Sequence, residues 1–202
     1  MESPIKVFSK WVINGKDEGM QKHHSSSVKN MLEYATKGLK NYSLIDAGCG
    51  NGWVVRDISL DHKCINAVGV DGSSNMIEKA KKIDNQNEYY CEDLIKWIPT
   101  KKVDIVHSME VFYYFEKPEL LTKHIYDNWL VEGGKLIMGI DYYHENKPSH
   151  TWQKDCGISI MKMFPKENWI TFFKKAGFNK IESWFHGAEG DWNGTLIILG
   201  VK

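Results

Sequence analysis

The chain has 202 residues, of which 42% are hydrophobic, and this length accommodates one domain with a full core. The 26 basic and 26 acidic side chains give a formal net charge of zero, so the overall basic field that drives binding to nucleic acid is excluded. No stretch approaches the roughly 20 apolar residues that span a bilayer, so we expect no membrane partner.

Cysteine and histidine spacing gives no sign of a disulfide framework or a metal centre. The four cysteines (Cys49, Cys64, Cys91 and Cys156) lie far apart, without a C-x-x-C pair. The histidines form no i, i+4 pair and do not cluster with cysteine. We therefore expect reduced thiols, a cytoplasmic location and no metal.

The N-terminal residues divide into an irregular part and a helical part. Residues 1–24 show no clear hydrophobic period, which favours a partly ordered arm. From Ser25 to Leu39 the apolar residues fall on one helical face: Val28, Met31, Leu32, Ala35 and Leu39. This pattern predicts a helix that packs on a sheet.

A short apolar run at Leu44 and Ile45 ends in Asp46 and is followed by glycines at every second position, Gly48 to Gly52. The pattern predicts a buried strand, a tight loop that exposes backbone to a ligand, and a helix from Trp53 to Leu60. The dinucleotide fingerprint requires a third glycine where this chain has Trp53, and no Gly-Lys-Ser/Thr follows, so dinucleotide and P-loop sites are disfavoured. An acid before the loop suits a ligand that carries an ammonium or a sulfonium.

Four further strands alternate with helices in the rest of the chain. We predict these strands at residues 67–71, 88–91, 103–108 and 135–140. Such alternation implies parallel strands joined by right-handed crossovers, with ligands bound outside their carboxyl ends. Asp71 ends its strand about 20 residues after the glycine loop, the distance at which an acid reaches a ribose diol.

The C-terminal quarter begins with an irregular stretch, residues 141–164, that leaves the sheet at the mouth of the predicted site. A helix from Pro165 follows, and Gly177 is expected to end it. Residues 180–186 and 195–201 read as two final strands joined by a turn.

The motif D-x-G-x-G-x-G at Asp46 to Gly52 resembles the first motif of the class I S-adenosylmethionine (SAM)-dependent methyltransferases. The resemblance covers residues 44–202 and implies a Rossmann-like three-layer α/β/α sandwich, with a seven-stranded, mostly parallel sheet and a C-terminal antiparallel hairpin. It implies SAM as the cofactor, with S-adenosylhomocysteine (SAH) as product. Residues 1–40 then form an arm and lid helix over a methyltransferase domain at 41–202, within a single domain overall.

The segment Ser108-Met109-Glu110-Val111 lacks the Asn/Asp-Pro-Pro-Tyr/Phe tetrad of amide and base N-methylases. It resembles the branch that acts on small metabolites. The positions implied to bind the cofactor are Asp46, Gly48, Cys49, Gly50, Gly52, Asp71, Gly72, Ser73, Met76, Glu92, Asp93, Leu94, Ser108 and Met109. Among these, Asp71 is expected on the ribose, Asp93 and Leu94 on the adenine, and Met76 either against the adenine or in the core.

The acceptor is expected to be a small molecule, methylated in a single in-line displacement for which the enzyme supplies alignment and a dry site. Expected acceptor contacts are Trp11, Met20, Tyr113, Tyr142, Tyr143, His150 and Trp152. Weak candidates for a catalytic base are Glu110, Asp141 and His144, followed by Tyr113, His150 and His186.

Two other functions stay open. A protein methyltransferase with the same cofactor site would need an exposed groove beside residues 141–152, and a SAM-binding module without catalysis is a further alternative. The sequence names neither the acceptor nor the methylated atom. We expect a monomer or a weak homodimer.

Overall fold

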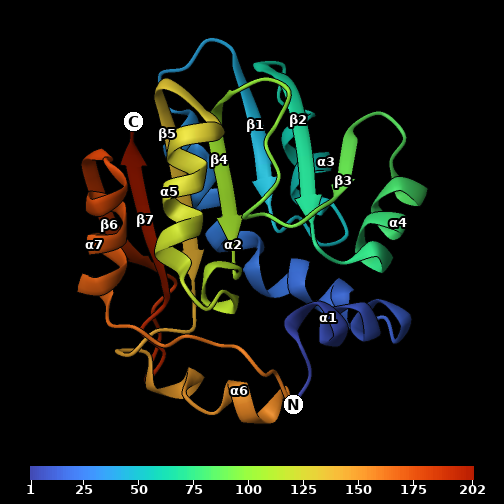
Figure 1. Cartoon of the computed structure of the whole chain (residues 1–202), viewed down its shortest axis with the longest axis vertical. Helices are drawn as coiled ribbons and strands as arrows, with labels where there is room; N and C mark the ends of the chain where they lie inside the picture. The colour runs from blue at the N-terminus through green and yellow to red at the C-terminus, as the bar shows by residue number, and fades with distance from the viewer.

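The computed structural model describes residues 1–202, which form one seven-stranded sheet with helices on both faces (Figure 1). The strand order is β3-β2-β1-β4-β5-β7-β6; β7 runs antiparallel to both of its neighbours, and all the other strand pairs are parallel. The strands are β1 (Tyr42–Ala47), β2 (Cys64–Asp71), β3 (Glu88–Cys91), β4 (Val103–Met109), β5 (Leu130–Ile140), β6 (Asn179–His186) and β7 (Thr195–Val201). The predicted Rossmann-like sheet with its C-terminal antiparallel hairpin is confirmed.

The helices occupy two layers, one on each face of the sheet. They are α1 (Pro4–Ile13), α2 (Asp17–Thr36), α3 (Trp53–Ile58), α4 (Ser74–Ile83), α5 (Pro118–Asn128), α6 (Trp152–Asp155) and α7 (Lys166–Ala176), with single 3-10 turns at Phe112–Tyr114 and Lys147–Ser149. Successive strand residues enter different cores: Ile45 packs with residues of α5 and α7, whereas Leu44 packs with residues of α2, α3 and α4. Strands buried on both faces explain why they read as continuous apolar runs.

The N-terminal region is more regular than the sequence indicated. Residues 1–24 were expected to be an irregular arm, but they form α1 and the first part of α2, which begins at Asp17 and not at Ser25. Val7 is the only buried residue of α1, and no apolar residue of α2 before Val28 is buried, so the hydrophobic period in this region is too weak to detect. As predicted, α2 packs on the sheet, against β4, β5 and β7.

Other element boundaries move by a few residues. β5 begins at Leu130 and not at Lys135, because its first residues pair with Val103 of β4 across an irregularity in register. Gly177 ends α7 as predicted, in the left-handed conformation at φ 110°. None of the helices combines the length and the apolar run that a bilayer span requires.

The end of the glycine loop is held by packing against β3. Gly52 has φ 78°, and a Cβ at this position would lie 2.4 Å from Cε1 of Tyr89, whose ring is buried. Gly38 has nearly the same φ, 80°, but nothing lies within 4 Å of its Cβ position. The two glycines therefore share a backbone conformation and differ in the space around them.

We expect Gly52→Ala to lower the free energy of unfolding by about 2 to 4 kcal/mol, and Gly38→Ala by only about 1 kcal/mol. Both variants place a side chain in the left-handed region, but only the first forces a collision with Tyr89. Urea unfolding measures the two losses through the transition midpoint at unchanged slope. Equal losses would show that the packing against Tyr89 is not what requires a glycine.

Candidate functional site

A cavity of about 500 Å³ lies outside the carboxyl ends of β1 to β4, where the sequence placed the site. Ten of the fourteen positions expected to bind the cofactor line it: Gly48, Gly50, Asp71, Gly72, Ser73, Met76, Glu92, Asp93, Leu94 and Met109. Asp46 and Cys49 line a narrower adjoining cavity. Gly52 and Ser108 line neither: Gly52 faces Tyr89, and the buried Ser108 hydroxyl donates to the carbonyl of Ala47.

Asp71, at the end of β2, joins the glycine loop to the start of α4. Its Oδ2 accepts a hydrogen bond from the Gly50 N–H at 3.0 Å, and its Oδ1 accepts from the Ser73 N–H at 2.8 Å. Burial raises the pKa of Asp71, whereas these two backbone donors act in the opposite direction. Since each carboxylate oxygen has two acceptor positions, the group can still accept from a ligand hydroxyl.

The adjoining narrow cavity, about 40 Å³, collects buried polar atoms that lack a partner. His107 lies beside Asp46 in the sheet, with Nδ1 2.7 Å from Asp46 Oδ1, but its Nε2 has no hydrogen bond. Asn51 Oδ1 and Asp17 Oδ1 are buried and unpaired as well. Buried polar groups are normally satisfied, so this end of the site suits the charged end of a ligand.

Sequence reasoning missed Asp17, Asn51 and His107. Asn51 Nδ2 donates to Asp17 Oδ2 at 2.9 Å, and Lys79 of α4 forms an ion pair with the same oxygen at 2.7 Å. Asp17 lies in α2, far from the glycine loop in sequence, so no local pattern could indicate this contact. His107 could have been found, because parallel pairing of β1 and β4 places it beside Asp46.

Helix α1 forms a wall of the cavity of about 500 Å³ through Pro4, Ile5 and Phe8. Ser9 Oγ lies 2.8 Å from Ser73 Oγ of α4, which ties the helix to the edge of the cavity. Just before the helix, Glu2 forms an isolated β-bridge with residues 157–159, and its carbonyl accepts a hydrogen bond from the Ser159 N–H at 2.8 Å. The N-terminal helix is therefore held over the cavity by Glu2, which precedes it, and by Ser9 near its middle, in the position of a lid (Figure 1).

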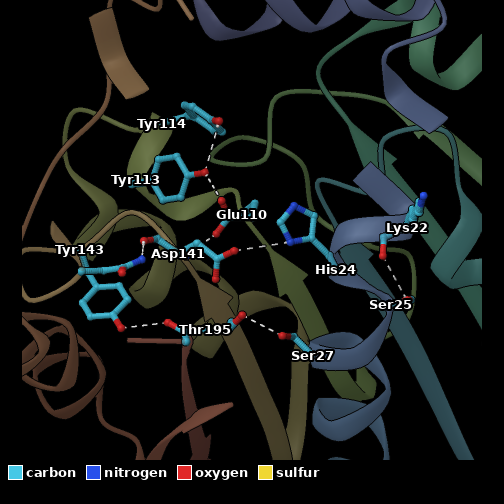
Figure 2. A network of polar contacts seen from close by, with 12 residues as sticks. Lys22, His24, Ser25, Ser27, Glu110, Tyr113, Tyr114, Asp141, Tyr143 and Thr195 are labelled. Carbon is cyan, nitrogen blue, oxygen red and sulfur yellow. Dashed lines mark hydrogen bonds and ion pairs between the residues drawn. The ribbon is translucent and has the colours of Figure 1, made fainter. Parts of the chain in front are cut away.

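Two buried acids, Glu110 and Asp141, meet beyond the glycine loop (Figure 2). Glu110 has φ 61°, a conformation rare outside glycine, which turns its side chain back toward β5. Its Oε1 accepts from the Asp141 backbone N–H, and its Oε2 accepts from the Tyr113 hydroxyl at 2.6 Å. His24 of α2 approaches Asp141 Oδ2 to 3.6 Å through its Nδ1.

The environment shifts the pKa values of all three groups. Burial, reinforced by the charge of Asp141, raises the pKa of Glu110 well above its usual range. Burial raises the pKa of Asp141 to about 6 and lowers the pKa of His24 to about 4. At neutral pH the imidazole is therefore neutral and cannot balance the carboxylates.

The other residues expected to contact an acceptor are dispersed. Met20 lines both cavities, whereas Trp11 packs edge-on against Phe8, with ring centroids 5.1 Å apart. Tyr113 and Tyr142 are buried against each other, and the Tyr143 hydroxyl donates to the carbonyl of Gly194 at 2.9 Å. These three tyrosines line neither the cavity of about 500 Å³ nor the narrow polar cavity.

The histidine candidates separate in the same way. His144 and His150 are exposed, and His150 Nε2 lies 2.8 Å from the carbonyl oxygen of His144. His186 and Trp152 line a separate cavity of about 590 Å³, together with His24 and Asp141. Asp141 and His24 thus line the cavity of about 590 Å³, whereas Glu110 lines the cavity of about 500 Å³.

Comparison with known proteins identifies the family of this arrangement. A family model described as a methyltransferase domain matches residues 20–183. Methyltransferase 235L of Invertebrate iridescent virus 6 is 26% identical over 171 residues, covering 84% of this chain and 59% of the viral protein. Trans-aconitate 2-methyltransferase of Klebsiella pneumoniae is 26% identical over 165 residues, covering 74% of this chain. The chain spans only 64% of the length of that enzyme.

Among solved structures, a complex from Haloferax volcanii joins the Trm112 methyltransferase activator to a methyltransferase chain that this protein resembles. The identity is 25% and the TM-score 0.83, with 100% of this chain and 98% of that chain covered. Two further neighbours, with TM-scores of 0.64 and 0.69, were solved with SAH and with SAM bound.

Asp141→Asn tests the energetic effect of the buried acid pair. The folded-state pKa of about 6 exceeds the ordinary 3.8, so ionisation of Asp141 destabilises the native state increasingly from pH 4 to pH 6 and fully above. We expect the variant to be more stable than wild type at pH 8, by up to about 3 kcal/mol, and the gain to vanish near pH 4.

Urea unfolding between pH 4 and pH 8, in EDTA to remove stray cations, measures this difference. Asp155→Asn, at an exposed position on α6, is the matched control. A difference between Asp141→Asn and wild type that does not change with pH would contradict the raised pKa.

Proposed function

The chain belongs to the methyltransferase domain family, and we propose that it transfers the methyl group of SAM to a small-molecule acceptor in a single in-line displacement. The observation that carries this proposal is the cavity of about 500 Å³ beneath α1. Its walls contain both the predicted cofactor positions and a group of aromatic side chains, Phe8, Tyr114 and Phe115. A volume of this order suits one nucleoside and a small partner.

The predicted cofactor contacts follow one path through this cavity. Gly48 and Gly50 follow β1 and line both cavities, Asp71 ends β2, and Asp93 and Leu94 follow β3 and line only the cavity of about 500 Å³. This order supports the assignment of the amino acid, ribose and adenine of SAM to successive strand ends.

The amino-acid end of SAM carries an ammonium and a carboxylate, and we place both in the narrow cavity. The unpaired oxygens of Asn51 and Asp17 and the Asp46 carboxylate suit the ammonium, and so does the unpaired Nε2 of His107, which is an acceptor when Nδ1–H donates to Asp46. Such an assignment would satisfy polar atoms that are otherwise buried without a hydrogen bond.

The acceptor would occupy the part of the cavity lined by Glu110, Val111, Tyr114, Phe115 and Ile160, next to the glycine loop. This location differs from the predicted stretch at residues 141–152, most of which lies outside this cavity. Phe8 of the lid packs edge-on against Tyr114 at 5.1 Å, so closure of α1 and formation of the acceptor wall are coupled.

SAM supplies a methyl group already activated by its sulfonium, so the residues need only align the acceptor and exclude water. An acceptor that carries a proton must also lose it. Glu110 lies in the acceptor wall, and because its pKa is raised, its carboxylate, once ionised, is a stronger base than that of an exposed glutamate. We assign this role to Glu110 in preference to His144, which is exposed.

A macromolecular acceptor is the second candidate function. It is favoured by the cavity of about 590 Å³ beside Asp141, Trp152 and Trp192, where an exposed groove was expected for a protein substrate. The Haloferax volcanii structure, which includes the Trm112 activator, adds an activator protein as a hypothetical binding partner of this chain.

Asp71→Ala tests the cofactor assignment. We expect the dissociation constant for SAM to rise more than about tenfold, because a charge-assisted contact is lost and the Gly50 and Ser73 N–H groups lose their acceptor. Wild-type protein should melt several degrees higher at saturating SAM, through ligand linkage. Calorimetric titration measures both proteins, with Asp127→Ala on the exposed face of α5 as the control. An unchanged dissociation constant would remove Asp71 from the site.

A screen with methyl-labelled SAM separates the two acceptor classes. Label should enter the low-molecular-weight fraction of a cell extract, and Tyr114→Ala should lower this turnover at least about tenfold while changing the SAM dissociation constant less than about threefold. Tyr34→Ala, which removes a half-exposed ring on α2, is the matched control. Label confined to protein or RNA would support the second candidate and contradict the first.

A further inference from the structure

We propose that His24, Glu110 and Asp141 form a binding site for one divalent transition-metal cation, of the type of Mn²⁺ or Zn²⁺. The three side chains come from α2, from the segment after β4 and from the end of β5. One ligand atom from each lies within 4.8 Å of the other two. Figure 2 shows the carboxylates of Glu110 and Asp141 and the ring of His24 turned toward one another.

The charge of this cluster requires a balancing group. Glu110 is 8% exposed and Asp141 is 5% exposed, and no lysine or arginine forms an ion pair with either of them. Keeping both carboxylates ionised out of water without a cationic partner is strongly unfavourable, and the raised pKa values of both acids reflect this. A divalent cation would neutralise both at once.

The polar atoms of the cluster are also incompletely bonded. Asp141 Oδ1 is buried and has no hydrogen-bond partner. Asp141 Oδ2 and His24 Nδ1 face each other at 3.6 Å, which is too long for a hydrogen bond and close to the separation of two ligands of one metal ion. A cation bound by both atoms would explain why this imidazole nitrogen and this carboxylate oxygen lie close together without a hydrogen bond.

The donor set selects the class of ion. Imidazole nitrogen favours transition metals over Mg²⁺ and Ca²⁺, and carboxylate oxygens suit Mn²⁺ and Zn²⁺. With bonds of about 2.1 Å, two ligand atoms of one ion are at most about 4.2 Å apart, so the cluster must contract by roughly half an ångström. Small side-chain rotations suffice for this change.

The position of the cluster gives the cation a use. Glu110 faces the cavity of about 500 Å³, and Asp141 and His24 line the cavity of about 590 Å³, so the ion would lie between them. Three protein ligands leave coordination positions open for water or for an oxygen of the acceptor. This last step rests on the proposed function, whereas the metal site itself does not.

The test is a titration of the full chain with Mn²⁺ after removal of metals with EDTA, in the absence of SAM. Electron paramagnetic resonance of the free ion counts the bound ions, and Zn²⁺ is then added as a competitor. We expect one Mn²⁺ per chain, displaced by Zn²⁺, with the dissociation constant raised at least about tenfold in His24→Ala and in Asp141→Asn.

His23→Ala is the matched control, because it removes the exposed neighbouring imidazole and leaves the cluster intact. Its Mn²⁺ affinity should stay within about twofold of wild type. Thermal melting of each variant shows that it is folded, and Glu110→Gln provides a third variant if His24→Ala is unstable. Absence of Mn²⁺ binding by wild type, or equal affinity in all variants, overturns the proposal.

The outcome is independent of the cofactor assignment. SAM binding is measured on the same preparation by its effect on the melting temperature. If the protein binds SAM but not Mn²⁺, only the proposed metal site is refuted. If it binds Mn²⁺ but not SAM, only the proposed cofactor function is refuted.

Discussion

The site depends on one constraint, the convergence of parallel strands whose carboxyl ends carry acids. Asp71 shows how this edge is organised, since its carboxylate accepts from the backbone of Gly50 after β1 and of Ser73 before α4. One buried side chain thereby fixes a loop and a helix start on either side of the same cavity. The backbone N–H groups of Gly48 and Cys49, which donate to the carbonyl of Val70, hold the start of the same loop against β2.

The N-terminal helices complete what the sheet begins. Without α1 the strand ends would border an open cleft; Ile5 and Phe8 turn that cleft into a cavity of about 500 Å³. The beginning of α2 contributes Asp17 and His24, which the sheet could not supply. This arrangement explains why the hydrophobic period of the N-terminal helices is weak. Helix positions that face a polar site carry polar residues, so the apolar stripe is interrupted there.

The acid pair shows how one region serves two needs. Glu110 bonds the backbone of Asp141 and the hydroxyl of Tyr113, so it holds the segment after β4 against the end of β5. Its positive φ is retained because these contacts over-determine it. The same contacts bring the Asp141 carboxylate near the neutral imidazole of His24, between the two cavities. The residues that support this part of the fold are therefore also the ones that could take part in its chemistry.

The sequence by itself indicated the strands and the parallel joining of those that alternate with helices, because strand periodicity, glycine turns and helix alternation are local signals. The seven-stranded sheet with its closing antiparallel hairpin was implied by the family resemblance of the glycine motif. The sequence also placed Asp71, Asp93 and Met76 at the cavity, since strand ends in a parallel sheet must share one edge. Only the tertiary structure decided the partners of Asp46, the helical form of residues 4–13 in the expected lid and the meeting of His24 with Glu110 and Asp141. These depend on contacts between residues far apart in the chain, and no spacing within a single sequence encodes how a helix docks across the edge of a sheet.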